Sequence, residues 1–480
     1  MSDHSTLVRA LFTPRAVALI GASADPNKNS GRPQRFLKAH GFTGEVYPIN
    51  PGRDEVQGVK AYKSVLDVPG PVDHAFVMVP AKFVEDAIRE CGEKGVPVAT
   101  IYSDGFAETG DDGRKMQERL VATARKVGVR LIGPNSMGVI HPASSLTLSV
   151  NAVLEMEGIK PGGMSLISQS GTILGTLLSR GAARGVGFAR MIGVGNESDL
   201  GVGELVDLLV DDPDTKSILL FLEAVRDGDK LAAAARRAYD AGKPVLAYKL
   251  GRSEAGRELA LSHSGAIAGP AKAADAFFQA NAIARLEMLE GLLEASPLFI
   301  GHPPPKGKRV AVVTTTGGGA ALVADRLGML GATLVPAPES VRTALREHGL
   351  EIGRGPLVDL TMAGTREGVY GAALENLLAA DEIDAVVTVV GSSGQFKPEL
   401  AVAPIVEKAA GSSKPVAAFI APQADKSLAL LQEAGIANFR TPEACADALM
   451  AFLNRRAPRP IPAPGSLPQR SASYSARTPA

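Results

Sequence analysis

A short apolar strand followed by a turn of glycine and other small residues occurs three times, and this repeat constrains the fold most strongly. The copies are VALIGAS from Val17, MSLISQSG from Met164 and VAVVTTTGGG from Val310, so their starts are 147 and 146 residues apart. Each copy precedes a helical stretch, which is the strand–turn–helix arrangement of a phosphate-binding α/β unit. We therefore expect an α/β protein built from three similar units in succession.

The strands expected within each unit are short and almost wholly apolar. Strands of this kind, alternating with amphipathic helices, are typical of parallel sheets covered on both faces. We expect three parallel-sheet domains of the Rossmann-like or flavodoxin-like kind. Their main strands read VALIG, GEVYPIN, HAFVMVP, PVATIYS and VRLIGPN; then MSLIS, FARMIGVG, SILLFLE, PVLAYKL and AIARL; then VAVVTTT, ATLVP, AVVTVVG and PVAAFIA.

Clusters of glycine and proline mark the expected boundaries between these domains. EGIKPGG separates the first two units and GHPPPKGK the second and third. The residues after Asn454 include six prolines, five arginines and no acidic residue, so we expect a disordered or docking tail. The predicted parts are residues 1–150, 151–303, 304–455 and the tail at 456–480.

The charge and cysteine content exclude several classes of protein. Lys+Arg and Asp+Glu both number 51, so no global field favours nucleic acid or an acidic membrane. Cys91 and Cys445 are far apart, which argues against a disulfide framework and suits a reducing cytosol, with both as small buried hydrophobes. No secretory leader and no apolar run of about 20 residues is visible, so we expect a cytoplasmic protein without membrane spans. The absence of HxH, HExxH and CxxC predicts no protein-bound metal.

His263 is the most chemically suggestive residue. It lies in the small-residue run LALSHSGAIAGP, which follows the expected strand PVLAYKL. An imidazole in such a loop is free to swing and can carry a phosphoryl group, although an ordinary surface histidine is the alternative. Glu223 ends the apolar strand SILLFLE at the same sheet edge. It could bond one ring nitrogen of the histidine and raise the nucleophilicity of the other, or simply turn into solvent.

Two strand–helix turns could bind an anion. SQSG (168–171) ends a strand and opens a helix, and TTTGGG (314–319) repeats the arrangement in the third unit. Free N–H groups at a positive helix end attract phosphate, while a tight turn that needs glycine only for clearance is the alternative. The predicted phosphate-binding residues are Ser170, Gly171, Thr172, Gly317, Gly318 and Gly319.

The first unit carries a weaker signal in GASADPNKNSG, from Gly21 to Gly31. It lacks the G-x-G-x-x-G spacing of a dinucleotide site, and no acidic residue ends the second strand. A phosphate-bearing adenosine ligand, held by backbone N–H groups and Lys28, fits this loop better than NAD. An ordinary strand–helix turn is equally compatible with it.

Taken in order, these motifs resemble the NDP-forming acyl-CoA synthetases, which include the ADP-forming acetyl-CoA synthetases and are related to succinyl-CoA synthetase. The resemblance runs through VALIGAS, VYPINP, GPNSMG, SQSG, VGNESD, SILLFLE, SHSG and TTTGGGAALVADRL, and covers nearly everything before the tail. It departs from the family at Ser264, where a threonine is usual, and in the glycine spacing after GAS.

The resemblance implies a role for each motif. His263 would be the histidine phosphorylated during turnover, Glu223 would orient it, and the helices beginning at Ser170–Gly171 and at Gly317–Gly319 would hold the phosphohistidine. The first unit would bind coenzyme A, with the site lined by Gly21, Ala22, Ser23, Asn50, Pro51 and Pro80.

The family also needs an ATP-grasp module, and nothing in this sequence resembles one. The resemblance therefore implies an α-type subunit that joins a β-type ATP-grasp chain, which binds ATP and Mg²⁺, in a hetero-oligomer. The expected reaction converts a small carboxylic acid, CoA and NTP into acyl-CoA, NDP and phosphate, while His263 swings to the partner's nucleotide site. The alternatives are a non-catalytic CoA- or acyl-CoA-binding regulatory subunit and an NAD-dependent dehydrogenase.

Overall fold

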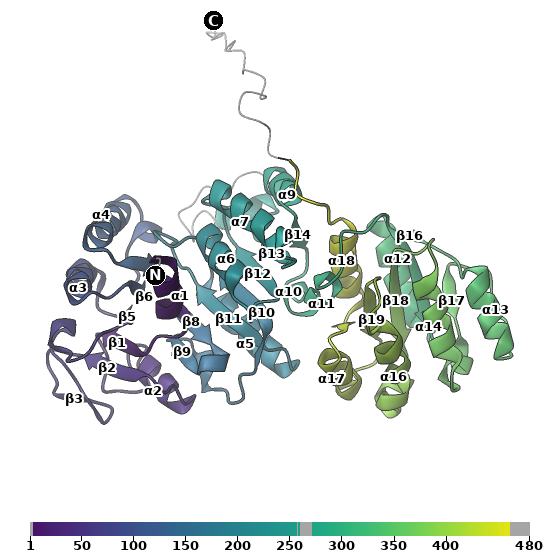
Figure 1. The fold of residues 1–480 in the computed structure, drawn as a ribbon, viewed down its shortest axis with the longest axis horizontal. Coiled ribbons are helices and arrows are strands. Elements are labelled where there is room, and N and C mark those ends of the chain that lie inside the picture. Colours follow the sequence, from purple (N-terminus) through teal and green to yellow (C-terminus); the bar gives the residue numbers. More distant parts are fainter. Residues whose placement is uncertain (1–2, 257, 260–270, 461–480) are drawn as a thin grey trace, which may run out of the picture.

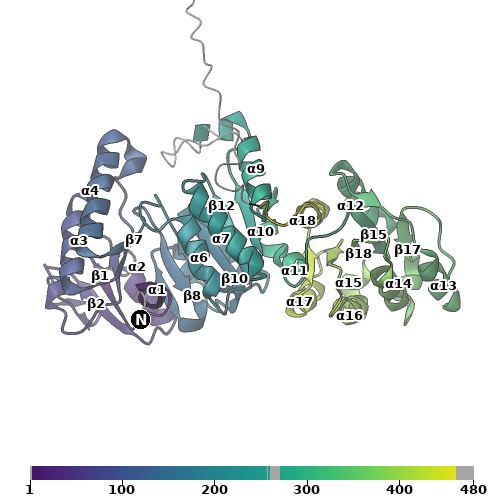
Figure 2. The same ribbon diagram turned by 45° about the horizontal axis from the view of Figure 1, so that its top comes forward.

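The computed structural model describes residues 3–256, 258–259 and 271–460. Three groups of strands and helices follow one another along the long axis of the molecule, in sequence order (Figure 1). The three groups also lie side by side in a view turned by 45°, with α18 between the second and third groups (Figure 2). Within the described residues, each group contains one large sheet.

The first sheet is wholly parallel, in the order β2-β1-β5-β6-β7. Its interior strand β1 is buried at every position, as expected for a strand covered on both faces. The elements of this group are α1 (Asp3–Phe12), β1 (Ala16–Ile20), α2 (Arg32–Ala39), β2 (Glu45–Ile49), the hairpin β3 (Glu55–Val56) and β4 (Val59–Lys60), η1 (Val65–Asp67), β5 (His74–Val77), α3 (Ala81–Lys94), β6 (Val98–Ile101), η2 (Ala107–Thr109), α4 (Asp111–Val127) and β7 (Arg130–Ile132).

The second sheet has the order β14-β13-β12-β10-β11-β8-β9. The strands from β14 to β11 are parallel, whereas β8 and β9 are antiparallel to their neighbours. Its elements are β8 (Gly138–His141), η3 (Pro142–Ser144), β9 (Leu146–Ser149), η4 (Ala152–Glu155), β10 (Pro161–Ser168), α5 (Gly171–Ala183), β11 (Phe188–Gly193), α6 (Val202–Asp211), β12 (Ser217–Leu222), α7 (Gly228–Asp240), β13 (Val245–Lys249), α9 (Ala271–Ala280), β14 (Ile283–Leu286), α10 (Gly291–Glu294) and α11 (Ser296–Phe299).

The third sheet is parallel, in the order β16-β15-β18-β19-β20, with β17 also paired to β15. Its elements are β15 (Arg309–Thr314), α12 (Gly317–Met329), β16 (Thr333–Leu334), α13 (Glu339–Glu347), β17 (Leu357–Asp359), η5 (Thr361–Thr365), α14 (Val369–Ala379), β18 (Ala385–Val390), α15 (Ser393–Phe396), α16 (Pro398–Ala409), β19 (Val416–Ile420), α17 (Asp425–Glu433), β20 (Ala437–Phe439) and α18 (Pro442–Leu453).

Every strand named in the sequence analysis is present, and the α/β class with mainly parallel sheets is confirmed. The expectation of wholly parallel sheets is wrong for β8 and β9. Both strands fall within the predicted first domain, residues 1–150, and were not themselves predicted, yet they extend the second sheet, which therefore begins before residue 151. They are joined by one short turn, which permits antiparallel pairing without a crossover helix.

The hydrophobic core continues from one group to the next. One cluster joins Leu166 and Phe188 of the second sheet to Val312 and Phe439 of the third, through buried residues of α18. A second hydrophobic cluster joins buried residues of the first sheet to buried residues of the second sheet. The described part of the chain therefore packs as one continuous body rather than as three separately enclosed cores.

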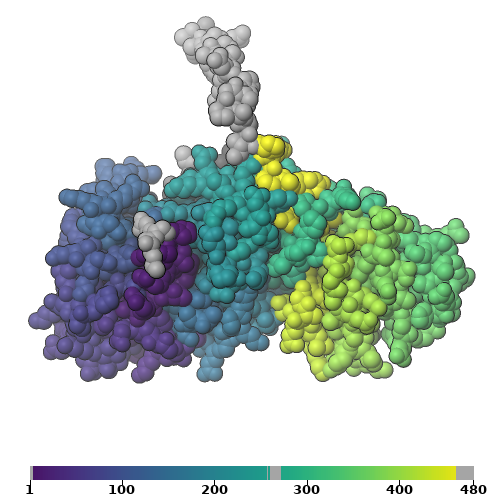
Figure 3. Space-filling view, in the orientation of Figure 1, coloured from purple at the N-terminus to yellow at the C-terminus, as the bar shows by residue number. Residues whose placement is uncertain are grey.

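Polar contacts also fix α18 against the second sheet. The buried carboxylate of Asp447 accepts hydrogen bonds from the backbone nitrogens of Glu287 and Met288, at 2.8 and 3.0 Å. The residues after α18 then return along the second group (Figure 3). Arg459 donates its backbone N–H to the carbonyl of Ala280 at 2.9 Å.

Arg455 is the main anchor of this returning segment. It is buried, its guanidinium lies 5.4 Å from the ring of Tyr239 and 5.9 Å from that of Phe299, and it donates to the carbonyl of His302 at 3.0 Å. The segment predicted as a tail from residue 456 thus starts with residues that contact the second group. Residues 461–480 of that predicted tail lie outside the described residues.

Both cysteines are unpaired and buried, as predicted. Burial raises the pKa of the Cys91 thiol to about 12 and also raises that of Cys445, so both act as small apolar side chains. No helix in the described parts of the chain is long and apolar enough to cross a bilayer.

Candidate functional site

Glu223 and Gln169 are brought together by neighbouring strands. β10 and β12 are parallel and adjacent, so the residues that follow them meet at one edge of the sheet. The side-chain oxygen of Gln169 accepts hydrogen bonds from the backbone nitrogens of Glu223 and Ala224, at 2.6 and 3.0 Å. Its side-chain nitrogen donates to the Ala224 carbonyl at 2.9 Å. The backbone that presents Glu223 is therefore held by one amide, and the Glu223 side chain is buried rather than turned into solvent.

Lys249 supports the same turn from the next strand, β13. Its buried ammonium donates to the carbonyls of Glu223 and Leu250, both at 2.7 Å. Burial, with a smaller contribution from Arg285, lowers the pKa of Lys249, while Glu223 acts in the opposite direction. The lysine thus places positive charge beside Glu223 at the carboxyl edge of the sheet.

Helix α5 begins immediately after this turn. Ser170 is its N-cap, and the Ser170 hydroxyl accepts from the backbone nitrogen of Ile173 at 3.4 Å. Ser168 fixes the turn, since its hydroxyl donates to the Ser170 carbonyl at 2.6 Å and accepts from the Ser170 nitrogen at 3.1 Å. The first turn of α5, with Gly171 and Thr172, therefore presents the positive end of a 13-residue helix.

These elements line a cavity of about 670 Å³. Its lining includes Glu223 and the first turn of α5, together with the rings of Phe221 and Tyr248, which stack at a separation of 5.7 Å. The lining residues are Ser170, Thr172, Ile173, Phe221, Glu223, Tyr248, Leu250, Gly251, Gly256, Leu259 and Leu289. A carboxylate, a helix N-terminus and an apolar wall in one cavity suit an anion and an organic group together.

The predicted nucleophile His263 lies outside the described residues, as does the rest of the SHSG motif. The described chain that leads to it does reach the cavity, because Gly256 and Leu259 are among the lining residues. His263 follows Leu259 by four positions in the sequence.

In the first group, Gly21, Ala22 and Asn50 come together at the carboxyl ends of β1 and β2. Gly21 has a φ of +88°, and a Cβ there would lie 3.0 Å from Val79 Cγ1, so the position needs glycine. The Asn50 side chain donates to the Ala22 carbonyl at 2.9 Å. Pro80 is the N-cap of α3, directly after the next strand, β5.

The other residues predicted to bind coenzyme A, which are Ser23, Lys28 and Pro51, are less enclosed. The backbone nitrogen of Ser23 donates to the Ser30 carbonyl at 3.1 Å, Lys28 is exposed, and Pro51 is exposed beyond β2. Gln57 was missed by sequence reasoning, although its side chain donates to the Ser23 and Gly31 carbonyls, both at 2.9 Å. Nothing in the sequence marks Gln57, since it lies in a small hairpin whose closeness to the loop arises only in the fold.

A second cavity, of about 540 Å³, joins the first and second groups. Asn29, from the predicted coenzyme loop, lies within it and donates to the Tyr102 hydroxyl at 2.8 Å. Arg32 lines it as well and donates to Asn29 at 2.9 Å. Thr172 of α5 lines both this cavity and the one beside Glu223. The first turn of α5 therefore links the loop of residues 21–31 to the Glu223 cavity.

Gly317, Gly318 and Gly319 do open a helix, α12, as predicted. Thr314 and Thr316 repeat the hydroxyl–backbone pattern of Ser168 and Ser170 at 2.8 to 3.0 Å. However, these glycines do not line the Glu223 cavity as far as the described residues define it. A Cβ on Gly317 would lie 3.0 Å from the carboxylate of Asp359, so an acidic side chain already faces this helix end.

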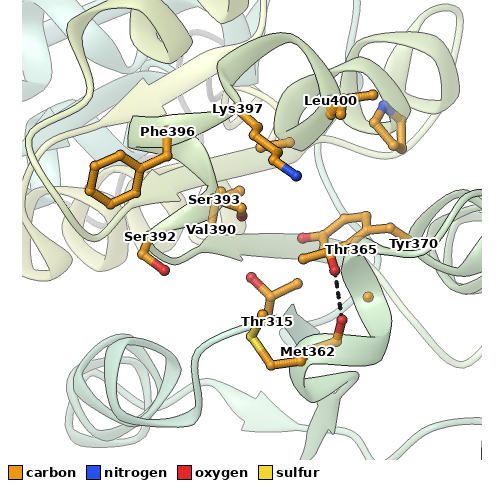
Figure 4. Close-up of a pocket in the computed structure, with 13 residues that line it drawn as sticks. Thr315, Met362, Thr365, Tyr370, Val390, Ser392, Ser393, Phe396, Lys397 and Leu400 are labelled. Atoms are coloured by element: carbon orange, nitrogen blue, oxygen red, sulfur yellow. Dashed lines mark hydrogen bonds between the residues drawn. The ribbon is translucent and has the colours of Figure 1, made fainter.

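A separate cavity of about 250 Å³ lies at the carboxyl ends of β15 and β18 (Figure 4). Thr365, on its wall, donates to the Met362 carbonyl at 2.7 Å. Phe396 and Leu400 are exposed beside it, and Lys397 contributes one cation. Its lining residues, Thr315 and others of the third group, include none of those that line the cavity beside Glu223.

Sequence reasoning missed Gln169 and Lys249, which hold the backbone of Glu223, and it noted Glu197, which bonds Gln169, only as part of the polar loop VGNESD. Gln169 could have been found, because it lies inside the SQSG motif that was chosen for its serines and glycine. Lys249 also had a signal, a cation near the end of an otherwise apolar strand. No group of three His, Cys, Asp or Glu side chains suited to a metal ion occurs within the described ranges.

Comparison with protein families gives two matches. Residues 15–142 match a CoA binding domain, and residues 161–299 match a succinyl-CoA ligase like flavodoxin domain. The first match contains Gly21, Asn50 and Pro80, and the second contains Glu223 and His263.

Among curated proteins, the chain is 35% identical over 452 residues to the α subunit of an ADP-forming acetate–CoA ligase II of Pyrococcus furiosus, covering 92% of this chain and 97% of that one. It is also 32% identical to an ADP-forming acetate–CoA ligase II of Archaeoglobus fulgidus, covering 82% of this chain but 59% of the longer relative. Among solved structures, a dinucleotide forming acetyl-coenzyme A synthetase 1 of Ca. Korarchaeum cryptofilum, in complex with phosphate and ADP, matches with a TM-score of 0.81 and 30% identity, over 93% of this chain and 96% of that one.

Proposed function

This chain belongs to the family of ADP-forming acyl-CoA ligases, as an enzyme chain of the α-subunit type, and from that premise we propose how its residues share the reaction. The reaction joins a carboxylic acid to coenzyme A at the expense of ATP, with ADP and phosphate as products. The ligases among the relatives favour neither a dehydrogenase nor a non-catalytic sensor.

Coenzyme A is assigned to the carboxyl edge of the first sheet. Gly21 lets the chain turn at a φ of +88° tightly against Val79, and Asn50 and Pro80 border the same edge. Ser23, Lys28 and Pro51 complete the proposed site at its exposed side. From there the thiol end of the coenzyme would reach Thr172 through the cavity beside Asn29 and Arg32.

The nucleotide is assigned to a second chain. The Pyrococcus relative is named as an α subunit, and the longer Archaeoglobus relative extends well beyond the length that this chain matches. We assign the remaining function to a β-type ATP-grasp partner, which would hold ATP and Mg²⁺ in a hetero-oligomer.

His263 is proposed to carry the phosphoryl group between the two sites. After transfer from ATP, a carboxylate oxygen of the acid attacks the phosphorus of phosphohistidine, the P–N bond breaks and an acyl phosphate forms. The thiolate of CoA then attacks the acyl carbon, and phosphate leaves with the electron pair of the C–O bond. Glu223 would hold one ring nitrogen of His263, so that the other is the nucleophile.

The position of the first turn of α5 carries this proposal. Thr172 borders both the cavity of the coenzyme loop and the cavity of Glu223, so one positive helix end faces both places. Phosphate released or accepted beside CoA would be bound in the cavity that Glu223 also lines. The equivalent role of Gly317, Gly318 and Gly319 stays a prediction from the resemblance.

Labelling tests the proposal directly. The chain is incubated with its ATP-grasp partner and ATP labelled in the γ-phosphate, and the protein is examined for acid-labile, base-stable label. We expect the label on His263, and we expect H263A to lose it together with synthetase activity while keeping its affinity for CoA. Full synthetase activity in H263A would overturn the assignment.

A further inference from the structure

Glu197 is buried behind the proposed site and has no part in the chemistry described above. It lies in the loop after β11, its side chain is 3% exposed, and its φ is +57°. That left-handed conformation costs a residue other than glycine on the order of 1 kcal/mol, so the surroundings must favour it. Two hydrogen bonds do so: the carboxylate accepts from the Val202 nitrogen and from the Gln169 side-chain nitrogen, both at 2.7 Å.

The bond to Glu197, together with the bond to the Ala224 carbonyl, determines which way the amide of Gln169 faces. An ionised carboxylate can only accept hydrogen bonds, so the NH₂ end of Gln169 must face Glu197. The oxygen end then faces the opposite way, where it accepts from the backbone nitrogens of Glu223 and Ala224. With the amide reversed, its NH₂ group would meet those two N–H donors, and both bonds would be lost.

We propose that Glu197 is a positioning residue for Glu223: its carboxylate fixes the amide of Gln169, and that amide fixes the backbone from which Glu223 projects. The inference rests on the proposed function for the role of Glu223 itself. It assigns to Glu197 no contact with substrate.

The charged groups around Glu197 define its working range of pH. Arg226 lies 3.5 Å from the carboxylate and favours its ionised form, whereas Asp227 opposes it. Burial is the largest effect and raises the pKa of Glu197. A protonated Glu197 keeps one acceptor oxygen for two N–H donors, those of Val202 and Gln169, so one of the two bonds is lost and positioning should weaken on the acidic side.

The test compares E197Q with D199N, since Asp199 is a buried carboxylate of the same loop. The Asp199 carboxylate accepts hydrogen bonds from the side chain of Arg130 and from the backbone nitrogen of Leu131, both at 2.9 Å. These bonds lead to the first group and not to Gln169. Both changes remove one loop charge, so a merely structural effect should be similar in the two variants. Melting temperatures of both establish that they are folded.

The first readout needs no catalysis. Amide hydrogen exchange at Glu223 and Ala224, followed in the full chain, should be about tenfold faster in E197Q than in D199N, because the acceptor of these two N–H groups is displaced. Equal exchange in the two variants would overturn the inference.

The second readout uses the chain with its partner. In E197Q we expect kcat to fall about a hundredfold with the KM for CoA unchanged, as for a misplaced reacting group, and the acidic limb of the kcat–pH profile to disappear. In D199N kcat and that limb should be retained. Equal kcat losses in both variants would overturn the inference. If the wild-type complex carries no phosphohistidine while the exchange difference holds, the proposed function fails and the link from Glu197 to the Glu223 backbone stands.

Discussion

The Asp447 carboxyl group of α18 should make the protein less stable as the pH rises toward neutrality. Burial raises its pKa from 3.8 to about 6, despite the hydrogen bond from Met288 and the charges of three arginines, Arg326, Arg252 and Arg285, which act in the opposite direction. Because the folded-state value lies above the unfolded one, folding favours the protonated acid. That contribution is fully present below pH 3.8 and is lost as the pH rises through about 6.

The structure sets the size of this effect. A difference of roughly two pKa units corresponds to about 3 kcal/mol. In Asp447→Asn the amide oxygen can still accept from Glu287 and Met288, which both bond to the same carboxylate oxygen in the wild type. The variant removes the buried charge without orphaning either N–H group.

Urea unfolding at a series of pH values from 4 to 8 measures the effect. We expect Asp447→Asn to exceed the wild type in unfolding free energy by up to about 3 kcal/mol at pH 8, and the difference to shrink as the pH falls toward 4. Asp447→Ala should be less stable than Asp447→Asn at every pH, because two buried N–H groups lose their acceptor. A variant Asp447→Asn that is less stable than the wild type at pH 8, or a difference independent of pH, would refute the reasoning.

Three further changes test other parts of the structure. Gly21→Ala should weaken CoA binding, measured by calorimetry, at least tenfold. Its control is Gly41→Ala, because Gly41 has a similar φ of +78° but open space around it; this change should lower the unfolding free energy by about 1 kcal/mol and leave CoA binding intact. Arg455→Ala should lower the unfolding free energy, measured by the same urea assay, by about 1–3 kcal/mol through loss of its ring contacts. Its control, Arg456→Ala, should have little effect, because the Arg456 side chain bonds to the nearby carbonyls of Leu453 and Arg455. Arg190→Ala should destabilise the chain by about 3–5 kcal/mol, since it leaves the buried carboxylate partner of Arg190 without its cation; a loss below 1 kcal/mol would contradict this.

The sequence determined the local structure and the closeness of SQSG to Glu223. Short, nearly all-apolar runs predict strands that are covered on both faces, and β1, β12 and β15 are of this kind. The same reasoning put Glu223 at the carboxyl edge beside SQSG, since parallel strands end together. His263 was selected for its chemistry and its neighbours, which are properties of the chain itself.

Tertiary structure alone decided which groups support Glu223 and how the units join. Gln169, Glu197 and Lys249 are separated by 28 to 80 positions in the sequence, and only adjacent strands bring them around one turn. β8 and β9 pair with the second sheet because edge pairing depends on which neighbour is free, a property that no local pattern carries. The core that the second and third groups share through α18, like the raised pKa of Asp447, depends on burial. Burial of a given side chain is decided only when segments distant in the sequence pack together.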